Sequence, residues 1–181
     1  MDNNTKTTIA MVSITGPDKV GIISDIAGRL FDLGVNFGDT TFAVLGGNAE
    51  FSAICELQGE TDISILKSEL SALDSLSDAE ISVSHFSIKN DSPASKSITH
   101  NIKIYGGDRP GLLARLCEVF QQFNANIVQL NSERHISNNG GEYTISVAVS
   151  IPEDATDSCL AHIANTAGEL GLSCDWKKSQ S

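Results

Sequence analysis

The sequence predicts an α+β protein in which one βαββαβ unit is written twice. The prediction starts from two turns, Gly16–Ile23 and Gly106–Leu113, each lying between an apolar β-rich run and an amphipathic run. Their glycines keep one offset, because 106 − 16 and 111 − 21 both equal 90. The apolar positions Leu30 and Phe120 keep the same offset. We therefore expect two units of one design, each with the same turn.

The bulk composition fits two small globular domains. The chain has 181 residues, and because about 100–200 residues per domain is usual, its length allows one or two domains. The repeat favours two. A hydrophobic fraction of 40% and a charged fraction of 19% are typical of folded protein. A polar, proline-containing segment separates the copies. We expect a first domain at 1–88, a linker at 89–97 and a second domain at 98–181.

Charge and motif content exclude several classes of protein. The net charge is −11 and the longest basic run is Lys177-Lys178, which argues against direct nucleic-acid binding because phosphate contact needs a basic face. No apolar run approaches the roughly 18 residues of a membrane span, and the polar N-terminus resembles no secretory signal, so a cytoplasmic protein without a membrane partner is expected. The four cysteines lack CxxC spacing and lie apart from the histidines. We expect reduced thiols, no metal and no cofactor.

Apolar periodicity predicts the elements of the first unit in order. The first strand is apolar on both faces, which is typical of a central strand. The helix after it places Ile26 and Leu30 on one stripe, and Gly34 suits its C-terminal end. Gly46-Gly47-Asn48 predicts a hairpin, and Thr61-Asp62 opens a second helix. The expected elements are a strand at 7–15, a helix to about 33, strands at 35–45 and 50–57, a helix from 61, and a strand at 81–88.

The second unit repeats this order. In the strand before Pro152, apolar residues alternate with small ones, which indicates one sheet face covered by helices and one face lined with small residues. The order βαββαβ is that of the ferredoxin-like fold. Bare sheet edges are a liability, so we expect the two sheets to pair into one eight-stranded antiparallel sheet with four helices on one side. The expected elements are a strand at 98–105, a helix at 113–123, strands at 126–136 and about 143–150 joined by a turn at 138–141, a helix within 152–169, and a strand at 172–176.

The repeated turn has residues suited to a helix start. Asp18 and Asp108 are placed to accept hydrogen bonds from the first free N–H groups of the helices that follow. Pro110 fits a first helical turn, where no N–H is needed. Gly21 and Gly111 remove a side chain near the helix start. Two explanations stay open for these glycines: close packing of helix on strand, and approach of a ligand to the backbone.

A helix start and a nearby asparagine together suit an amino acid. Free N–H groups at a helix start attract a carboxylate, an effect of about 0.3–1 kcal/mol at an exposed site. Asn36 and Asn126 carry both donors and an acceptor, which a zwitterion requires. A lone asparagine between helix and strand is more often a turn residue. Here 126 − 36 again equals 90, and the repetition favours a role in binding.

The turn Gly107-Asp108-Arg109-Pro110-Gly111, with Asn126 at the head of the second strand of the unit, resembles the signature of the ACT domain family. These are small regulatory modules that bind amino acids. The turn Pro17-Asp18-Lys19-Val20-Gly21 departs from the signature at Lys19 and Val20. The resemblance covers about residues 7–88 and 98–177. It implies a ligand cleft between paired modules, in which the turn of one faces the asparagine of the other. The implied ligand-binding residues are Asp18, Lys19, Val20, Gly21, Ile22, Asn36, Gly107, Asp108, Arg109, Pro110, Gly111, Leu112 and Asn126.

Three hypotheses for function follow. The first is a non-enzymatic sensor of a small amino acid such as glycine or serine that controls a partner regulatory protein. A free-standing tandem of this kind resembles the glycine cleavage system transcriptional repressor group, regulators that act through a partner transcription factor. The second is an interaction module whose ligand sites have decayed, as Lys19-Val20 suggests. An enzyme is the third, and no local nucleophile–base signature or phosphate loop supports it. The ligand's identity and a homodimeric state stay open.

Overall fold

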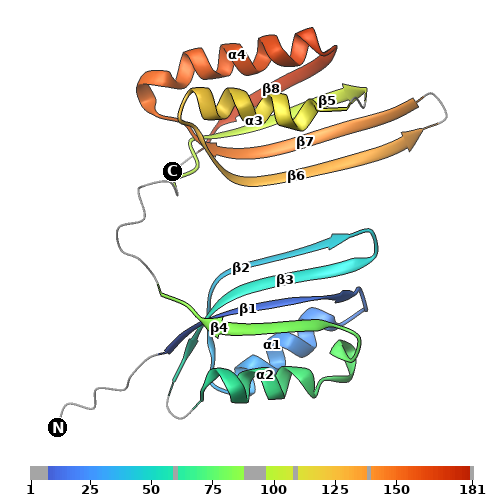
Figure 1. Ribbon diagram of the computed structural model, residues 1–181, viewed down its shortest axis with the longest axis vertical. Coiled ribbons are helices and arrows are strands. Elements are labelled where there is room, and N and C mark those ends of the chain that lie inside the picture. The colour runs from blue at the N-terminus through green and yellow to red at the C-terminus, as the bar shows by residue number, and fades with distance from the viewer. Residues whose placement is uncertain (1–7, 59–60, 88–96, 108–109, 138–139, 180–181) are drawn as a thin grey trace. The chain divides into compact units, whose positions relative to one another are not determined.

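The computed structural model describes residues 8–58, 61–87, 97–107, 110–137 and 140–179. The chain divides into two compact units, residues 1–89 and 90–181, and each is described by itself. Each unit contains one four-stranded antiparallel sheet with two α-helices over one face (Figure 1). The element order βαββαβ occurs twice, which confirms the predicted fold class.

The first sheet has the strand order β2-β3-β1-β4, so β1 is a central strand as predicted. Alternate residues of β1, namely Ala10, Val12 and Ile14, are buried against the helices. The opposite face of the sheet carries no helix (Figure 1). The elements of this unit are β1 (Thr8–Pro17), α1 (Ile22–Asp32), β2 (Asn36–Leu45), β3 (Asn48–Leu57), α2 (Ile63–Ser71), a 3₁₀ turn η1 (Asp74–Leu76) and β4 (Glu80–His85).

Two amphipathic helices close this core. Ile26 and Leu30 of α1 are buried as predicted, and Leu66 and Leu70 of α2 complete the same cluster. Full burial of a side chain of this kind stabilises the fold by about 1.5–3 kcal/mol. Between the helices, the Arg29 guanidinium donates to the Glu69 carboxylate. Both side chains are about one-third exposed, so the burial contributes far more than this ion pair.

Local sequence signals mark the ends of the helices and the hairpin. Gly34 has a φ of 68°, and the next residue closes α1 by donating its N–H to Leu30 O at 3.0 Å. The second unit uses Asn124 at the equivalent position, with a φ of 51°. The predicted hairpin is present, but its turn has two residues, Gly46 and Gly47, with φ of 59° and 86°, because Asn48 already belongs to β3.

Asp62 caps α2 through its side chain, as the sequence predicts for the start of that helix. Its Oδ1 accepts from the Ser64 hydroxyl at 2.6 Å and from the backbone N–H groups of Ser64 and Ile65 at 2.8 and 2.9 Å. These hydrogen bonds, led by the Ser64 hydroxyl, hold the pKa of Asp62 below its ordinary value.

The second sheet repeats the first, with the order β6-β7-β5-β8. The predicted turn at 138–141 is partly wrong: Gly140 and Gly141 already belong to β7, where they pair with Ser137 and Ile136. Residues 138–139 lie outside the described residues. The elements are β5 (His100–Gly107), α3 (Leu112–Gln122), β6 (Asn126–Ser137), β7 (Gly140–Ser150), a 3₁₀ turn η2 (Glu153–Ala155), α4 (Thr156–Glu169) and β8 (Leu172–Lys178).

The second core has the same layout as the first. It joins Ile102 and Ile104 of β5 to Phe120 of α3 and Ile163 of α4. The pairing of the two sheets into one eight-stranded sheet stays a prediction, as do the domain boundaries and the linker. None of the helices in the described ranges has the length and apolar character of a transmembrane span.

A buried histidine lies at the start of β5. His100 is 6% exposed, and its Nδ1 lies 3.1 Å from the Thr99 hydroxyl. That hydroxyl donates to Val149 O and accepts from Ile151 N, so His100 Nδ1–H fills its remaining acceptor position. Burial, with a smaller effect from the charge of Lys178, lowers the pKa of His100.

We expect stability to depend on pH through His100. Because its pKa is lower in the folded chain than in the unfolded chain, its contribution is complete above about pH 6.5 and is lost as the pH falls below that value. Each unit of lowering corresponds to about 1.4 kcal/mol. Urea unfolding at about pH 7.5 and pH 5.5 should show a smaller pH effect in His100→Gln than in the unchanged protein. His135→Gln, at a side chain 61% exposed, is the control, and equal effects in both variants would contradict the expectation.

A second prediction concerns two glycines of the first unit. A Cβ at Gly16 would lie 2.7 Å from Ala79 Cβ and 2.8 Å from its Cα, so Gly16→Ala should destabilise the unit by about 1–3 kcal/mol. A Cβ at Gly28, on α1, meets nothing within 4 Å. Gly28→Ala should therefore stabilise the protein by about 0.5–1 kcal/mol. Thermal unfolding of the two variants checks the expected opposite signs.

Candidate functional site

Both units begin their first helix with a glycine that no side chain caps. Gly21 precedes α1 with a φ of 91°, and Gly111 precedes α3 with a φ of 79°. Both values lie in the left-handed region that favours glycine. Among the described residues, neither helix start donates an N–H to a capping side chain. We call the two helix starts, with the turns that lead into them, the helix mouths (16–22 and 106–112).

Space around these glycines rules out the packing explanation. A Cβ at Gly21 or Gly111 would meet no atom within 4 Å, so torsion, not crowding, requires glycine there. Crowding instead affects the glycines five residues earlier, Gly16 and Gly106. A Cβ at Gly106 would lie 2.7 Å from Leu172 Cδ2, as one at Gly16 would lie against Ala79. The earlier glycine of each turn therefore packs on the last strand's start, and the later one opens onto free space.

The predicted capping role of Asp18 is wrong. Gly21 holds the cap position, and Asp18 instead donates its backbone N–H to Gly47 O at 2.9 Å, at the tip of the β2–β3 hairpin. Asp108 and Arg109 lie outside the described residues, so their predicted roles are untested. Pro110 is exposed and precedes the cap residue, which places it just before the helix and not in its first turn.

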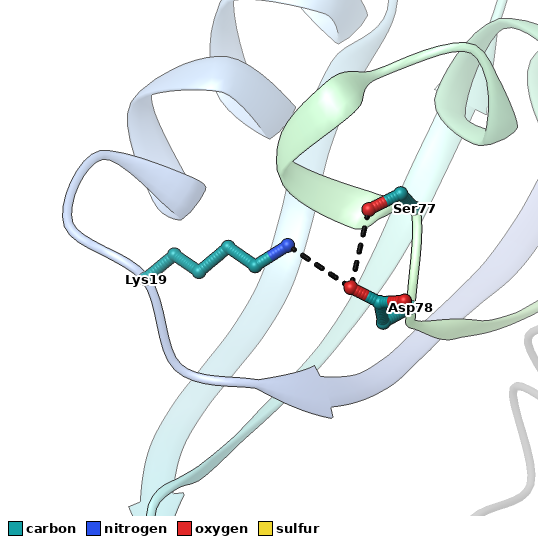
Figure 2. A network of polar contacts seen from close by, with 3 residues as sticks. All are labelled: Lys19, Ser77 and Asp78. Atoms are coloured by element: carbon teal, nitrogen blue, oxygen red, sulfur yellow. Dashed lines mark hydrogen bonds and ion pairs between the residues drawn. The ribbon is translucent and has the colours of Figure 1, made fainter.

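Figure 2 shows how Lys19 is held at the first helix mouth. Its Nζ lies 3.5 Å from Asp78 Oδ2, and the Ser77 hydroxyl donates to the same oxygen at 3.3 Å. The three residues bring the turn before α1 against the turn before β4. Val20, beside Lys19, is fully exposed. These two residues are where the first turn departs from the second, and sequence alone offered no signal for the contact with Asp78, 59 positions away.

Within one unit, the asparagine and the helix mouth lie at opposite ends of the sheet. Gly16 pairs with Ala49 at one end of β3, whereas Asn36 pairs with Glu56 at the other. The 11 residues of α1 span about 16 Å between those ends. Asn126 has the same position in the second unit, at the start of β6. A single unit therefore does not bring its own asparagine to its own helix mouth.

The first residue of each helix is anchored in the core, and an exposed or hollow surface lies beside it. Ile22 and Leu112, the first residues of α1 and α3, point their side chains into the cores and are 4% and 3% exposed. Gly107 is exposed at the end of β5. A hollow of about 230 Å³ adjoins Gly106 at the base of the second turn. A larger hollow lies elsewhere, on the helix-free face of the second sheet.

The chemistry available at the mouths is binding of an anion. Helix starts present N–H groups and a partial positive charge, which suit a carboxylate. Among the described residues, no group of three His, Cys, Asp or Glu side chains could hold a metal ion. Burial raises the pKa of Cys55 and Cys174 to about 11, and for Cys174 the charge of Asp175 adds to the effect, so neither thiol is activated as a nucleophile.

Comparison with known proteins gives the same two units. The model of the ACT domain family matches residues 8–84 and 101–177. A UPF0237 protein of Streptococcus pneumoniae is 26% identical over 74 residues, which are 41% of this chain and 84% of that protein. An unknown protein of Galdieria sulphuraria superimposes with a TM-score of 0.78 at 22% identity, covering 97% of this chain and all of that one. A protein proposed to be a glycine cleavage system transcriptional repressor superimposes with a TM-score of 0.68 at 15% identity, covering 97% and 99%.

The torsion at Gly21 gives a further prediction. Gly21→Ala should destabilise the protein by about 1–2 kcal/mol, because alanine is strained in the left-handed region. Gly21→Asn should cost less, since asparagine visits that region more readily. Chemical unfolding of both variants tests this. Were crowding the constraint, the larger asparagine would be the more damaging of the two.

Proposed function

The chain belongs to the ACT domain family, and on that premise we propose that it is a non-enzymatic regulator that binds a small amino acid between its two ACT domains. Glycine or serine is the expected size of ligand. The proposed binding residues are those of the two helix mouths together with Asn36 and Asn126. The amino acid would tighten the contact between domains and change a surface that a partner protein reads.

One observation carries this proposal: an uncapped, left-handed glycine opens the first helix of both domains. Gly21 and Gly111 have free space where a side chain would be. The same glycine occurs at the same position of both domains, and this repetition supports a common role in binding. A carboxylate at such a helix start gains from the N–H groups and from the helix dipole.

The amino group of the ligand needs a second partner. Asn36 and Asn126 lie far from the mouth of their own domain, so each is proposed to serve the other domain's mouth. Asp108 and its neighbours would then bind together with Asn36, and Asp18 and its neighbours with Asn126. An amide supplies an acceptor for ammonium and a donor for carboxylate in one side chain.

The size of the ligand bounds its affinity. Glycine has about five heavy atoms, and the best very small ligands reach about −1.5 kcal/mol per atom. The ceiling is therefore near −7.5 kcal/mol, a Kd of a few micromolar. Such affinity suits sensing of a metabolite pool.

The proposed readout is a partner protein, such as a transcription factor of glycine or one-carbon metabolism. The net charge of −11 and the scattered basic residues disfavour direct contact with DNA. The likeness to a protein proposed to be a glycine cleavage repressor supports the fold, and the regulatory role is inferred from it together with the family. A cytoplasmic location is part of the same proposal.

A second candidate applies to the first domain. There Lys19 is held by Asp78, and Val20 is fully exposed, whereas the second turn has Arg109 and Pro110. An exposed apolar side chain beside an engaged cation favours protein contact over ligand binding. On this alternative the chain is an interaction module whose ligand sites have decayed.

Calorimetric titration with glycine, serine and the other small amino acids tests the proposal. We expect saturable heat with at least one of them, and a raised melting temperature in its presence. Asn36→Ala and Asn126→Ala should weaken binding by about tenfold or more, as loss of a hydrogen bond to a charged group does.

Asn165→Ala, at an exposed asparagine of α4, is the matched control and should bind normally. Absence of heat with every amino acid, or an unchanged response in both asparagine variants, would favour the interaction module instead.

A further inference from the structure

The helix-free face of the second sheet contains a hollow of about 560 Å³. This volume lies within the roughly 300–1,000 Å³ of small-molecule sites. The hollow is separate from the second helix mouth, since its lining lies toward the start of β5 and the end of β8, whereas the mouth follows the end of β5. Its polar lining comes from all four strands: Asn101 and Lys103 of β5, Gln129 and Asn131 of β6, Ser146 of β7, and Asp175 and Lys177 of β8.

Strand register arranges these side chains in two rows across the sheet. In one row, Asn101 pairs with Lys177 on one side and with Ala148 on the other, and Ala148 pairs with Gln129. In the next row, Lys103 pairs with Asp175 and Ser146, and Ser146 pairs with Asn131. The small residues of β7 form the floor, and the longer side chains of the flanking strands form the walls.

The first domain provides an internal comparison, because its register is the same and its side chains differ. Met11 occupies the position of Asn101, and Ser13 that of Lys103. Ile54 stands where Ala148 forms the floor, so the first domain is filled where the second is hollow. Ser82 and Ser84 replace the two β8 residues Asp175 and Lys177. At these register positions the first domain therefore has no counterpart of the charged residues Lys103, Asp175 and Lys177, and the fold does not require them.

The charges of the hollow define the ligand. Lys103 and Lys177 supply two ammonium groups and Asp175 one carboxylate, and among the described residues none of the three forms an ion pair within 4 Å. Two positive charges and one negative charge complement a molecule with two carboxylates and one ammonium. The amides on β6 add donors and acceptors that either kind of ligand group can use.

We propose that the open face of the second ACT domain binds an α-amino dicarboxylate, the chemical class of glutamate and aspartate. The two carboxylates contact Lys103 and Lys177, and the ammonium contacts Asp175 with the amides of Gln129 and Asn131. This site is independent of the proposed site at the helix mouths. The protein would then respond to two amino-acid classes, each at its own surface.

Titration of the full chain with L-glutamate, followed by backbone amide NMR shifts, tests the proposal. Saturable shifts are expected on β5 to β8, with weaker binding at higher salt. Lys103→Ser and Lys177→Ser introduce the residues of the first domain and should raise the Kd about tenfold or more. Lys67→Ser removes an exposed lysine of α2 and should leave the Kd unchanged. Equal melting temperatures show that the variants remain folded.

Other outcomes distinguish the alternatives. Glutarate lacks the ammonium and glutamine lacks one carboxylate, so each should bind more weakly than L-glutamate. Equal binding of glutarate, equal weakening in Lys67→Ser, or absence of shifts on β5 to β8 would each overturn the proposal. Asn36→Ala and Asn126→Ala should not alter the L-glutamate shifts. The proposal for this site and the proposal for the helix mouths can therefore be refuted independently.

Discussion

The burial of one sheet face beneath two helices is the constraint on which each domain depends. Every second residue of the central strands points into that interface, as Val12 and Ile14 do in the first domain and Ile102 and Ile104 do in the second. Because side chains alternate along a strand, this requirement demands apolar residues on the face beneath the helices and places no such demand on the other face. The copies accordingly agree on their covered faces and differ on their open faces, where Met11 in one corresponds to Asn101 in the other.

Both copies of the repeated turn have glycine at the same two positions, but the physical reason for glycine differs between the two positions. Gly16 is required by the close approach of Ala79, and Gly106 both by the approach of Leu172 and by its own φ of 152°. Gly21 and Gly111 are required by a left-handed torsion in open space. The second pair is therefore the one at which the proposed ligand can approach the backbone. The first pair, Gly16 and Gly106, lets the turn pack against the start of the last strand.

The sequence predicts most of the fold because its signals are local. Strand alternation, helical stripes, Gly34 and the Gly46-Gly47 hairpin each act over a few residues, and all of them are confirmed. Two errors are local, the bounds of the turn at 138–141 and the place of Pro110, and the others fall where a longer-range contact decides. Asp18 was expected to cap a helix, but its backbone is held by Gly47 and the cap position passes to Gly21. The Lys19–Asp78 pair and the hollow walled by β6 and β8 depend on strand pairing, which residue spacing alone does not give.

Each core belongs to one domain, and this has a consequence for how the chain is made. The buried clusters of the first unit end at Leu76, and its last strand ends at His85. The first unit is thus complete before the second begins to emerge from the ribosome, and domains generally fold as units during synthesis. The nascent chain can therefore carry one finished domain while its sister is still being translated. Folding errors in the later half need not undo the earlier one.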